Sequence, residues 1–168
     1  MTGEPDTRDP ADGTATDVTS KQGGTLMPAE SFGYMVNFVA RLYARTMGRE
    51  MARHGAQMGY FPILLALWRQ GSATQSALAA EAQIEQPTVA ATLSRMERDG
   101  LVRRSPDPHD RRATRITLTA AGEALREPLT AAARRVNARS LATLTRVSAP
   151  DMLAALHELA AGLSDGEG

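Results

Sequence analysis

The sequence contains no cysteine, few aromatic residues and no long apolar run. The absence of cysteine excludes disulfides, thiolate metal sites and cysteine-based redox sensing. No apolar run approaches the roughly 20 residues that a helix needs to cross a bilayer. The beginning of the sequence also lacks the basic and apolar segments of a secretory signal. With 168 residues, we therefore expect one cytoplasmic domain that is large enough to bury its own core.

Lysine is nearly absent, and the charge is unevenly distributed. Lys21 is the only lysine, so every cation beyond it is an arginine, which suits bidentate contacts with phosphate. The formal net charge is zero, but residues 1–27 carry −3 and the remainder therefore carries +3. The stretch from Arg95 to Arg115 holds seven arginines against four acidic residues. This local excess indicates a polyanionic partner, although arginine usage also reflects the base composition of a genome.

The first part of the chain divides into a polar tail and two predicted helices. Residues 1–27 are rich in Gly, Thr, Asp and Pro, so we predict a disordered acidic tail before a domain that covers 28–168. From about residue 29 to 54, apolar side chains recur at helical spacing. A second helix is predicted over 60–69, where Pro62 is tolerated in the first turn.

The middle of the chain predicts two helices joined by a tight turn. Thr74 can cap a helix over 75–82. A helix over 87–99 begins with Pro87 and ends at Gly100, which suits the left-handed conformation that terminates helices. The residues expected to face the core are Leu78, Val89, Leu93 and Met96.

A β-hairpin and two further helices complete the predicted fold, which is mainly α-helical with a small β-hairpin. Strands near 101–105 and 114–119 flank an arginine-rich tip. Thr119 can cap a long helix over about 120–146, which Pro128 is expected to kink. A last helix follows from Pro150. The terminal helices expose more apolar surface than the compact middle can cover, so we expect a homodimer that buries them.

Three motifs follow one another in the middle of the chain. They are Gln86-Pro87-Thr88-Val89, then Arg95-Met96-Glu97-Arg98-Asp99-Gly100-Leu101-Val102, then Asp110-x-Arg112-x-x-x-Ile116-x-Leu118-Thr119. In this order and spacing they resemble the MarR family of winged helix-turn-helix transcriptional regulators. The resemblance is closest over about 61–122, and the helical pattern agrees with the family from about 30 to 163.

The resemblance implies a function and an assembly. It implies a DNA-binding lobe at about 60–119 and dimerisation through N- and C-terminal helices at about 29–54 and 120–163. The expected activity is sequence-specific transcriptional regulation, as a repressor, by a homodimer on a pseudo-palindromic operator. Members of the family are often released from DNA by a small aromatic ligand, which we include as an expectation.

The helix over 87–99 is sized for the major groove of duplex DNA. Gln86 can pair bidentately with adenine, and Thr88 can donate to a base or a phosphate, unless both side chains only cap or solvate the helix. Relatives commonly carry polar or basic residues where this chain has Ala90 and Ala91. An alanine there either contacts a thymine methyl or simply favours the helix. Arg95 is expected to reach a phosphate or to pair with Asp99 or Glu97. The predicted DNA-binding residues are Gln86, Pro87, Thr88, Ala91, Arg95, Arg111 and Arg112.

The tip of the hairpin carries the strongest predicted contacts. The resemblance places Arg112, with Arg111 beside it, in or near the minor groove, where the negative potential favours arginine. Asp110 would orient Arg112 and stiffen the loop. Arg103, Arg104 and Arg115 are supporting candidates for phosphate contacts.

A ligand site is predicted from residue types alone. Aromatic and sulfur-containing side chains of the first, second and fifth predicted helices suit a flat aromatic ligand, although methionine at helical spacing is more often ordinary core. The residues assigned to this site are Phe38, Met51, Tyr60 and Trp68.

Two other classes of protein compete with this interpretation. An enzyme is disfavoured, because the sequence holds no Gly-rich phosphate loop, no metal-ligand cluster and no nucleophile–base pair, and we expect neither a cofactor nor a metal. The alternative is a winged-helix module that binds another protein instead of DNA. Duplex affinity measured against salt concentration distinguishes the two.

Overall fold

The computed structural model describes residues 27–107 and 114–165. The chain separates into two compact units, residues 1–37 and 38–168, and the boundary falls inside the helix α1. The predicted acidic tail, apart from Met27, lies outside the described residues. The elements are η1 (Pro28–Glu30), α1 (Phe32–Ala52), η2 (Met58–Tyr60), α2 (Phe61–Gln70), β1 (Ser72–Thr74), α3 (Gln75–Ala82), α4 (Gln86–Arg98), β2 (Val102–Pro106), β3 (Thr114–Leu118), α5 (Ala120–Ala124), α6 (Arg126–Leu141) and α7 (Ala149–Asp165).

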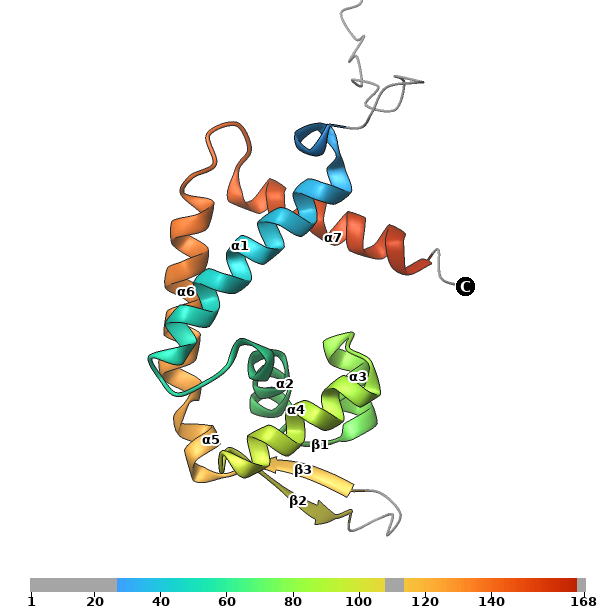
Figure 1. The fold of residues 1–168 in the computed structure, drawn as a ribbon, viewed down its shortest axis with the longest axis vertical. Coiled ribbons are helices and arrows are strands. Elements are labelled where there is room, and N and C mark those ends of the chain that lie inside the picture. Colours follow the sequence, from blue (N-terminus) through green and yellow to red (C-terminus); the bar gives the residue numbers. More distant parts are fainter. Residues whose placement is uncertain (1–26, 108–113, 166–168) are drawn as a thin grey trace, which may run out of the picture. The chain divides into compact units, whose positions relative to one another are not determined.

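The centre of the second unit is a winged helix-turn-helix, as predicted. Helix α4 lies beside strands β2 and β3, with α2 and α3 next to it (Figure 1). The sheet has the order β1-β3-β2, and both pairs of neighbouring strands are antiparallel. Strand β1 was not predicted, because three residues are too few to show an alternating pattern. Its Ala73 lies opposite Ile116 of β3, and both side chains are buried.

The predicted helix ends are confirmed in their local geometry. The Thr74 hydroxyl accepts a hydrogen bond from the backbone N–H of Ala77 at 3.2 Å, which caps α3. The Thr119 hydroxyl accepts in the same way from Gly122 N–H at 3.1 Å, which caps α5. Gly100 follows α4 with a φ of 72°, a conformation that costs glycine little because it has no Cβ. These short-range signals mark the beginnings of α3 and α5 and the end of α4.

The core lies among the helices and one face of the sheet. Val89, Leu93 and Met96 form the buried side of α4, and Leu78 of α3 is buried against them, as their spacing predicts. Met47 and Met51 bring the end of α1 into the same cluster. Because burying such side chains removes apolar area from water, this cluster holds α4 in place through one side only. The opposite side of α4 stays free for a partner.

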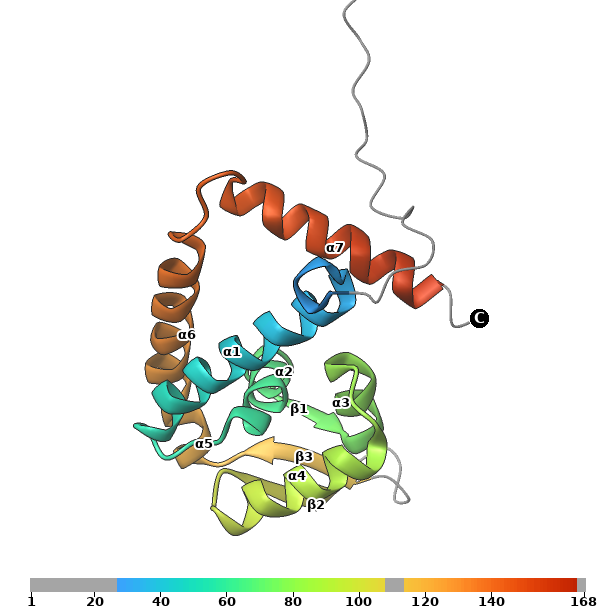
Figure 2. The ribbon, with the colours of Figure 1, turned by 45° about the horizontal axis from the view of Figure 1, so that its top comes forward.

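The predicted long helix over 120–146 is instead two helices. Helix α5 ends at Ala124, and α6 runs from Arg126 to Leu141, leading away from the sheet (Figure 2). We expected a kink at Pro128, but the break falls at Leu125. A proline lacks an amide N–H and its ring collides with the carbonyl four residues earlier, which here belongs to Ala124. The interruption therefore appears one turn before the proline itself.

Helix α7 differs from the other long helices in its burial. Among its described side chains none is buried, and Leu153, Leu156, Leu159 and Leu163 are all exposed. In the part of the chain that the structure describes, no helix combines the length and the apolar character needed to cross a bilayer. The exposed leucines of α7 therefore need another explanation.

Candidate nucleic-acid interface

The outer face of α4 carries five of the predicted contact residues. Gln86, Pro87, Thr88, Ala91 and Arg95 are all exposed. The helical period places Pro87, Ala91 and Arg95 away from the buried side. Gln86 lies seven residues before the buried Leu93 and is exposed in the first turn. Glu85 is the N-cap and its side chain makes no capping hydrogen bond, so neither Gln86 nor Thr88 serves as the cap. The first turn of α4 thus presents backbone N–H groups and two polar side chains to solvent together.

The polar side chains farther along α4 are held by the helix itself. The Thr92 hydroxyl donates to Thr88 O at 2.8 Å, and Arg95 Nη2 donates to the Thr92 oxygen at 3.1 Å. Thr92 is buried, so it forms a fixed base for the exposed arginine. Among the described residues Arg95 has no carboxylate partner, and the expected alternatives Asp99 and Glu97 pair elsewhere. Its charge remains available to a phosphate.

The end of α4 is tied to the core through Asp99. The Tyr60 hydroxyl donates to Asp99 Oδ2 at 2.7 Å, and Arg98 Nε donates to Oδ1 at 3.3 Å. The hydrogen bond from Tyr60 lowers the pKa of Asp99, burial opposes this effect, and Arg98 lowers the pKa further. Burial raises the pKa of Tyr60, with a smaller contribution from Asp99. Arg98 is exposed and forms a surface ion pair with Asp99.

Arginines of the wing strands also pair within the protein. Arg104 Nε lies 3.7 Å from Glu97 Oε2 on α4. Arg115 Nε lies 2.8 Å from Asp107 Oδ2, and Arg115 Nη1 donates to the Ser72 hydroxyl at 2.6 Å. Arg115, which we had considered for a phosphate contact, instead ties β3 to β1 and to the start of the wing. Sequence reasoning missed Asp107, which is 7% exposed, although an acidic residue between two prolines was a signal. The wing-tip residues Asp110, Arg111 and Arg112 lie outside the described residues.

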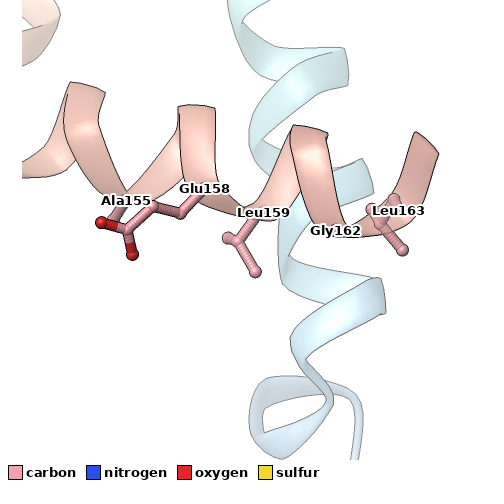
Figure 3. Close-up of a pocket in the computed structure, with 5 residues that line it drawn as sticks. All are labelled: Ala155, Glu158, Leu159, Gly162 and Leu163. Atoms are coloured by element: carbon pink, nitrogen blue, oxygen red, sulfur yellow. The ribbon is translucent and has the colours of Figure 1, made fainter. Parts of the chain in front are cut away.

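The residues assigned to an aromatic ligand occupy different environments. Met51 and Tyr60 are packed in the core, and Phe38 is exposed. Trp68 is half-buried, and its Nε1 donates to Gly122 O at 3.1 Å. Two surface hollows in the described part of the chain involve other residues. One of about 490 Å³ is lined by Ala155, Glu158, Leu159, Gly162 and Leu163 of α7 (Figure 3), and one of about 460 Å³ by Leu42, Arg45, Thr46 and Arg49 of α1.

The fold and the exposed face of α4 define a winged helix-turn-helix protein, and comparisons with known proteins show which family it resembles. The family model described as "MarR family" matches residues 58–114, about a third of the chain. Over this segment the chain is similar to the MarR family of transcriptional regulators. Members of this family are regulators of transcription and not enzymes. In the described residues, no group of three or more His, Asp or Glu side chains could hold a metal ion.

Three individual proteins illustrate the similarity. The HTH-type transcriptional repressor NicR of Pseudomonas putida is 33% identical over 84 residues, which are 50% of this chain; the chain spans about half (53%) of that relative's length. The M. tuberculosis transcriptional regulator MOSR, solved in complex with DNA, is 27% identical, with a TM-score of 0.70 over 80% of this chain and 97% of its own. A transcriptional regulator from Pseudomonas aeruginosa is 27% identical, with a TM-score of 0.67 over 80% of this chain and 98% of its own.

Proposed function

We propose that this chain is a sequence-specific DNA-binding transcriptional regulator whose α4 enters the major groove. The supporting observation is the division of α4 into two faces. Val89, Leu93 and Met96 are buried on one side, while Gln86 and Thr88 are exposed in the first turn of the helix. A helix held in this way places hydrogen-bonding side chains at base edges. The similarity to MOSR, which is solved in complex with DNA, supports this assignment.

The proposed contacts divide into base reading and phosphate binding. Gln86 and Thr88 would read bases, Ala91 would contact a thymine methyl, and Pro87 would pre-form the first turn. Arg95 would neutralise a phosphate. At the wing tip, Arg111 and Arg112 would bind in or near the minor groove with Asp110 orienting Arg112. Within this scheme residues 60–119 form the DNA-binding lobe, and the acidic segment 1–27 stays outside it.

We propose that the active form is a homodimer on a pseudo-palindromic site. Leu153, Leu156, Leu159 and Leu163 of α7 are between 41% and 73% exposed, which is unusual for a row of leucines on one helix. Ala155, Leu159 and Leu163 line the hollow along α7 (Figure 3). An apolar face of this kind is stabilised when a second copy covers it. The dimerisation helices would be those at about 29–54 and 120–163.

The proposed regulator acts as a repressor in the cytoplasm, where duplex DNA is its partner. The similarity to NicR, described as a transcriptional repressor, supports the sign of regulation. Release by a small aromatic ligand stays a prediction. Since Met51 and Tyr60 are packed in the core, a ligand at the predicted site would have to open that packing.

The decisive experiment is duplex binding titrated against salt. Fluorescence anisotropy would follow binding of the full chain to a labelled duplex that it selects from a random pool. Phosphate recognition predicts that log affinity falls linearly with log salt, with a slope of about −0.9 for each phosphate contacted. A module that binds a protein partner instead would select no sequence and show no such dependence. That outcome would overturn the proposal.

A further inference from the structure

The hydroxyl of the buried Tyr60 contacts the end of α4. Tyr60 closes the short helix η2 and is 1% exposed, and its hydroxyl lies 2.7 Å from Asp99 Oδ2. Asp99 is the C-cap of α4. Its other oxygen accepts from Arg98 Nε at 3.3 Å. One carboxylate therefore joins a core side chain to the solvent-facing end of the helix.

Local helix physics does not explain an acidic residue at this position. The C-terminal end of a helix carries partial negative charge, so a carboxylate there is unfavourable. Termination does not require it either, because Gly100 already provides the left-handed residue that ends α4. The hydrogen bond that Asp99 receives from a more distant element comes from Tyr60. The tertiary contact accounts for a residue that the helix alone would disfavour.

Because α4 is long, a small change of angle at its C-terminal end produces a large displacement at its N-terminal end. At 1.5 Å of rise per residue, Gln86 lies roughly 18 Å along the axis from Arg98, so a tilt of about 10° would displace Gln86 by roughly 3 Å. Side chains that read bases tolerate displacements of only about 0.5 Å. A flexible arginine at a phosphate tolerates much more. Loosening this end should therefore harm base reading before it harms general attraction to DNA.

We propose that Tyr60 and Asp99 are positioning residues, whose hydrogen bond sets the angle at which α4 presents Gln86 and Thr88 to the major groove. Neither side chain touches DNA in this arrangement. Both act through the helix that Asp99 terminates. The inference rests on the proposed function. It states that these two residues determine the sequence specificity of the proposed DNA interface. It also gives the Tyr60 hydroxyl a role that does not require a ligand.

The test compares two tyrosine-to-phenylalanine variants on two duplexes. One duplex is selected by the wild-type chain from a random pool, and the other is a scrambled duplex of the same composition. Tyr60→Phe should weaken binding to the selected duplex about five- to tenfold and leave the scrambled duplex nearly unchanged. Tyr43→Phe is the matched control, because the Tyr43 hydroxyl donates to Asn137 Oδ1 at 2.6 Å, between α1 and α6. It should leave both affinities as they are.

A ratio of two affinities separates positioning from general stability. A variant that is partly unfolded has fewer active molecules and loses affinity for both duplexes by the same factor. Equal losses would therefore overturn the inference. If the wild-type chain selects no duplex at all, the proposed function fails. If the wild type discriminates and Tyr60→Phe discriminates equally well, only the positioning role fails.

A double-mutant cycle tests whether the contact itself is responsible. Asp99→Ala should reproduce the loss of Tyr60→Phe, and the double variant should lose no more than either single variant. Asp99→Asn keeps an acceptor oxygen for the Tyr60 hydroxyl, so it should recover most of the discrimination. Additive losses from the two single variants would show that the residues act independently. That result would also overturn the inference.

Discussion

The winged lobe and helix α7 use their apolar side chains in opposite ways. In the lobe, α4 buries Val89, Leu93 and Met96 completely and leaves a polar face outside. In α7, no described side chain is buried, and Leu156 remains 50% exposed. The lobe is therefore stabilised within one chain, whereas the apolar side chains of α7 are left for the proposed dimer to cover.

Two glycines show the same difference in packing between the winged lobe and α7. A Cβ built on Gly122 of α5 would lie 2.2 Å from Leu101 O and 2.9 Å from Leu118 Cδ2. A Cβ built on Gly162 of α7 would meet nothing within 4 Å. Gly122 is therefore required by the close approach of α5 to the chain segment that follows α4. At Gly162, glycine is not required by any contact within the described chain.

The largest effect should come from a charge on the exposed face of α7. Leu156→Glu should convert the proposed dimer to monomers, because an ionised carboxylate cannot be buried without a partner. Losing the second lobe removes the gain of bivalent binding, so operator affinity should fall about 100-fold. Analytical ultracentrifugation and anisotropy would measure the two consequences.

The exposed Leu65 of α2 supplies the matched control for that variant. Leu65 is 46% exposed but lies on the winged lobe, so Leu65→Glu should leave the dimer intact. A Leu156→Glu protein that remains dimeric and binds tightly would show that α7 is not the interface. A partner other than a second copy of the chain would then have to cover the exposed face of α7.

The second effect concerns folding stability. Gly122→Ala should destabilise the folded chain by about 2 kcal/mol, because the new methyl group collides with backbone at Leu101. For a chain of this size the melting temperature should fall by roughly 6 °C. Gly162→Ala should instead be neutral or slightly stabilising, since alanine favours helix and meets no obstacle. Equal melting temperatures for the two variants would contradict the difference in packing.

A smaller effect is expected from an arginine at the tip of the wing. Arg112→Ala should reduce the magnitude of the salt slope by about 0.9 and weaken binding to most sequences by a similar factor. Arg49→Ala, at an exposed position of α1, should leave the slope unchanged. If Arg112→Ala alters preference at one base pair only, Arg112 reads a base and does not bind the backbone.

Features that depend on neighbouring residues were predictable from the sequence. The caps at Thr74 and Thr119, the end of α4 at Gly100 and its buried side all follow from short-range patterns. The exposed face of α4 followed from the same periodicity. For these elements the local preferences and the tertiary structure agree.

Contacts between distant segments were not predictable in the same way. Strand β1 pairs with β3, and Arg115 contacts both Asp107 and Ser72 at the base of the wing. The contact between Tyr60 and Asp99 joins residues 39 positions apart. Neither residue type nor spacing indicates such a pair. The sequence therefore indicated the helix that we propose to read DNA, but not the contact that we propose to set its angle.

The finest distinction concerns the partners of two tyrosine hydroxyls, that of Tyr60 in the winged lobe and that of Tyr43 in α1. Asn137, the partner of Tyr43, does not titrate, whereas Asp99, the partner of Tyr60, does. The lowered pKa of Asp99 means that its contribution to stability is present above the ordinary carboxyl value of 3.8 and is lost as pH falls through the lowered value. Tyr60→Phe removes the largest cause of that shift. Its free energy of unfolding should therefore depend less on pH than that of the wild type below about pH 4.

The dependence of the free energy of unfolding on alkaline pH provides a check on this assignment. Burial raises the pKa of both Tyr43 and Tyr60 above the ordinary value of 10.0. Each phenol therefore contributes stability that is present below pH 10.0 and is lost as pH rises through the raised value. In each phenylalanine variant the free energy of unfolding should therefore depend less on pH in the alkaline range. Only Tyr60→Phe should also flatten the acid limb. Urea unfolding across both limbs would show this, and an acid limb changed equally by Tyr43→Phe would mean that Asp99 is not what couples Tyr60 to α4.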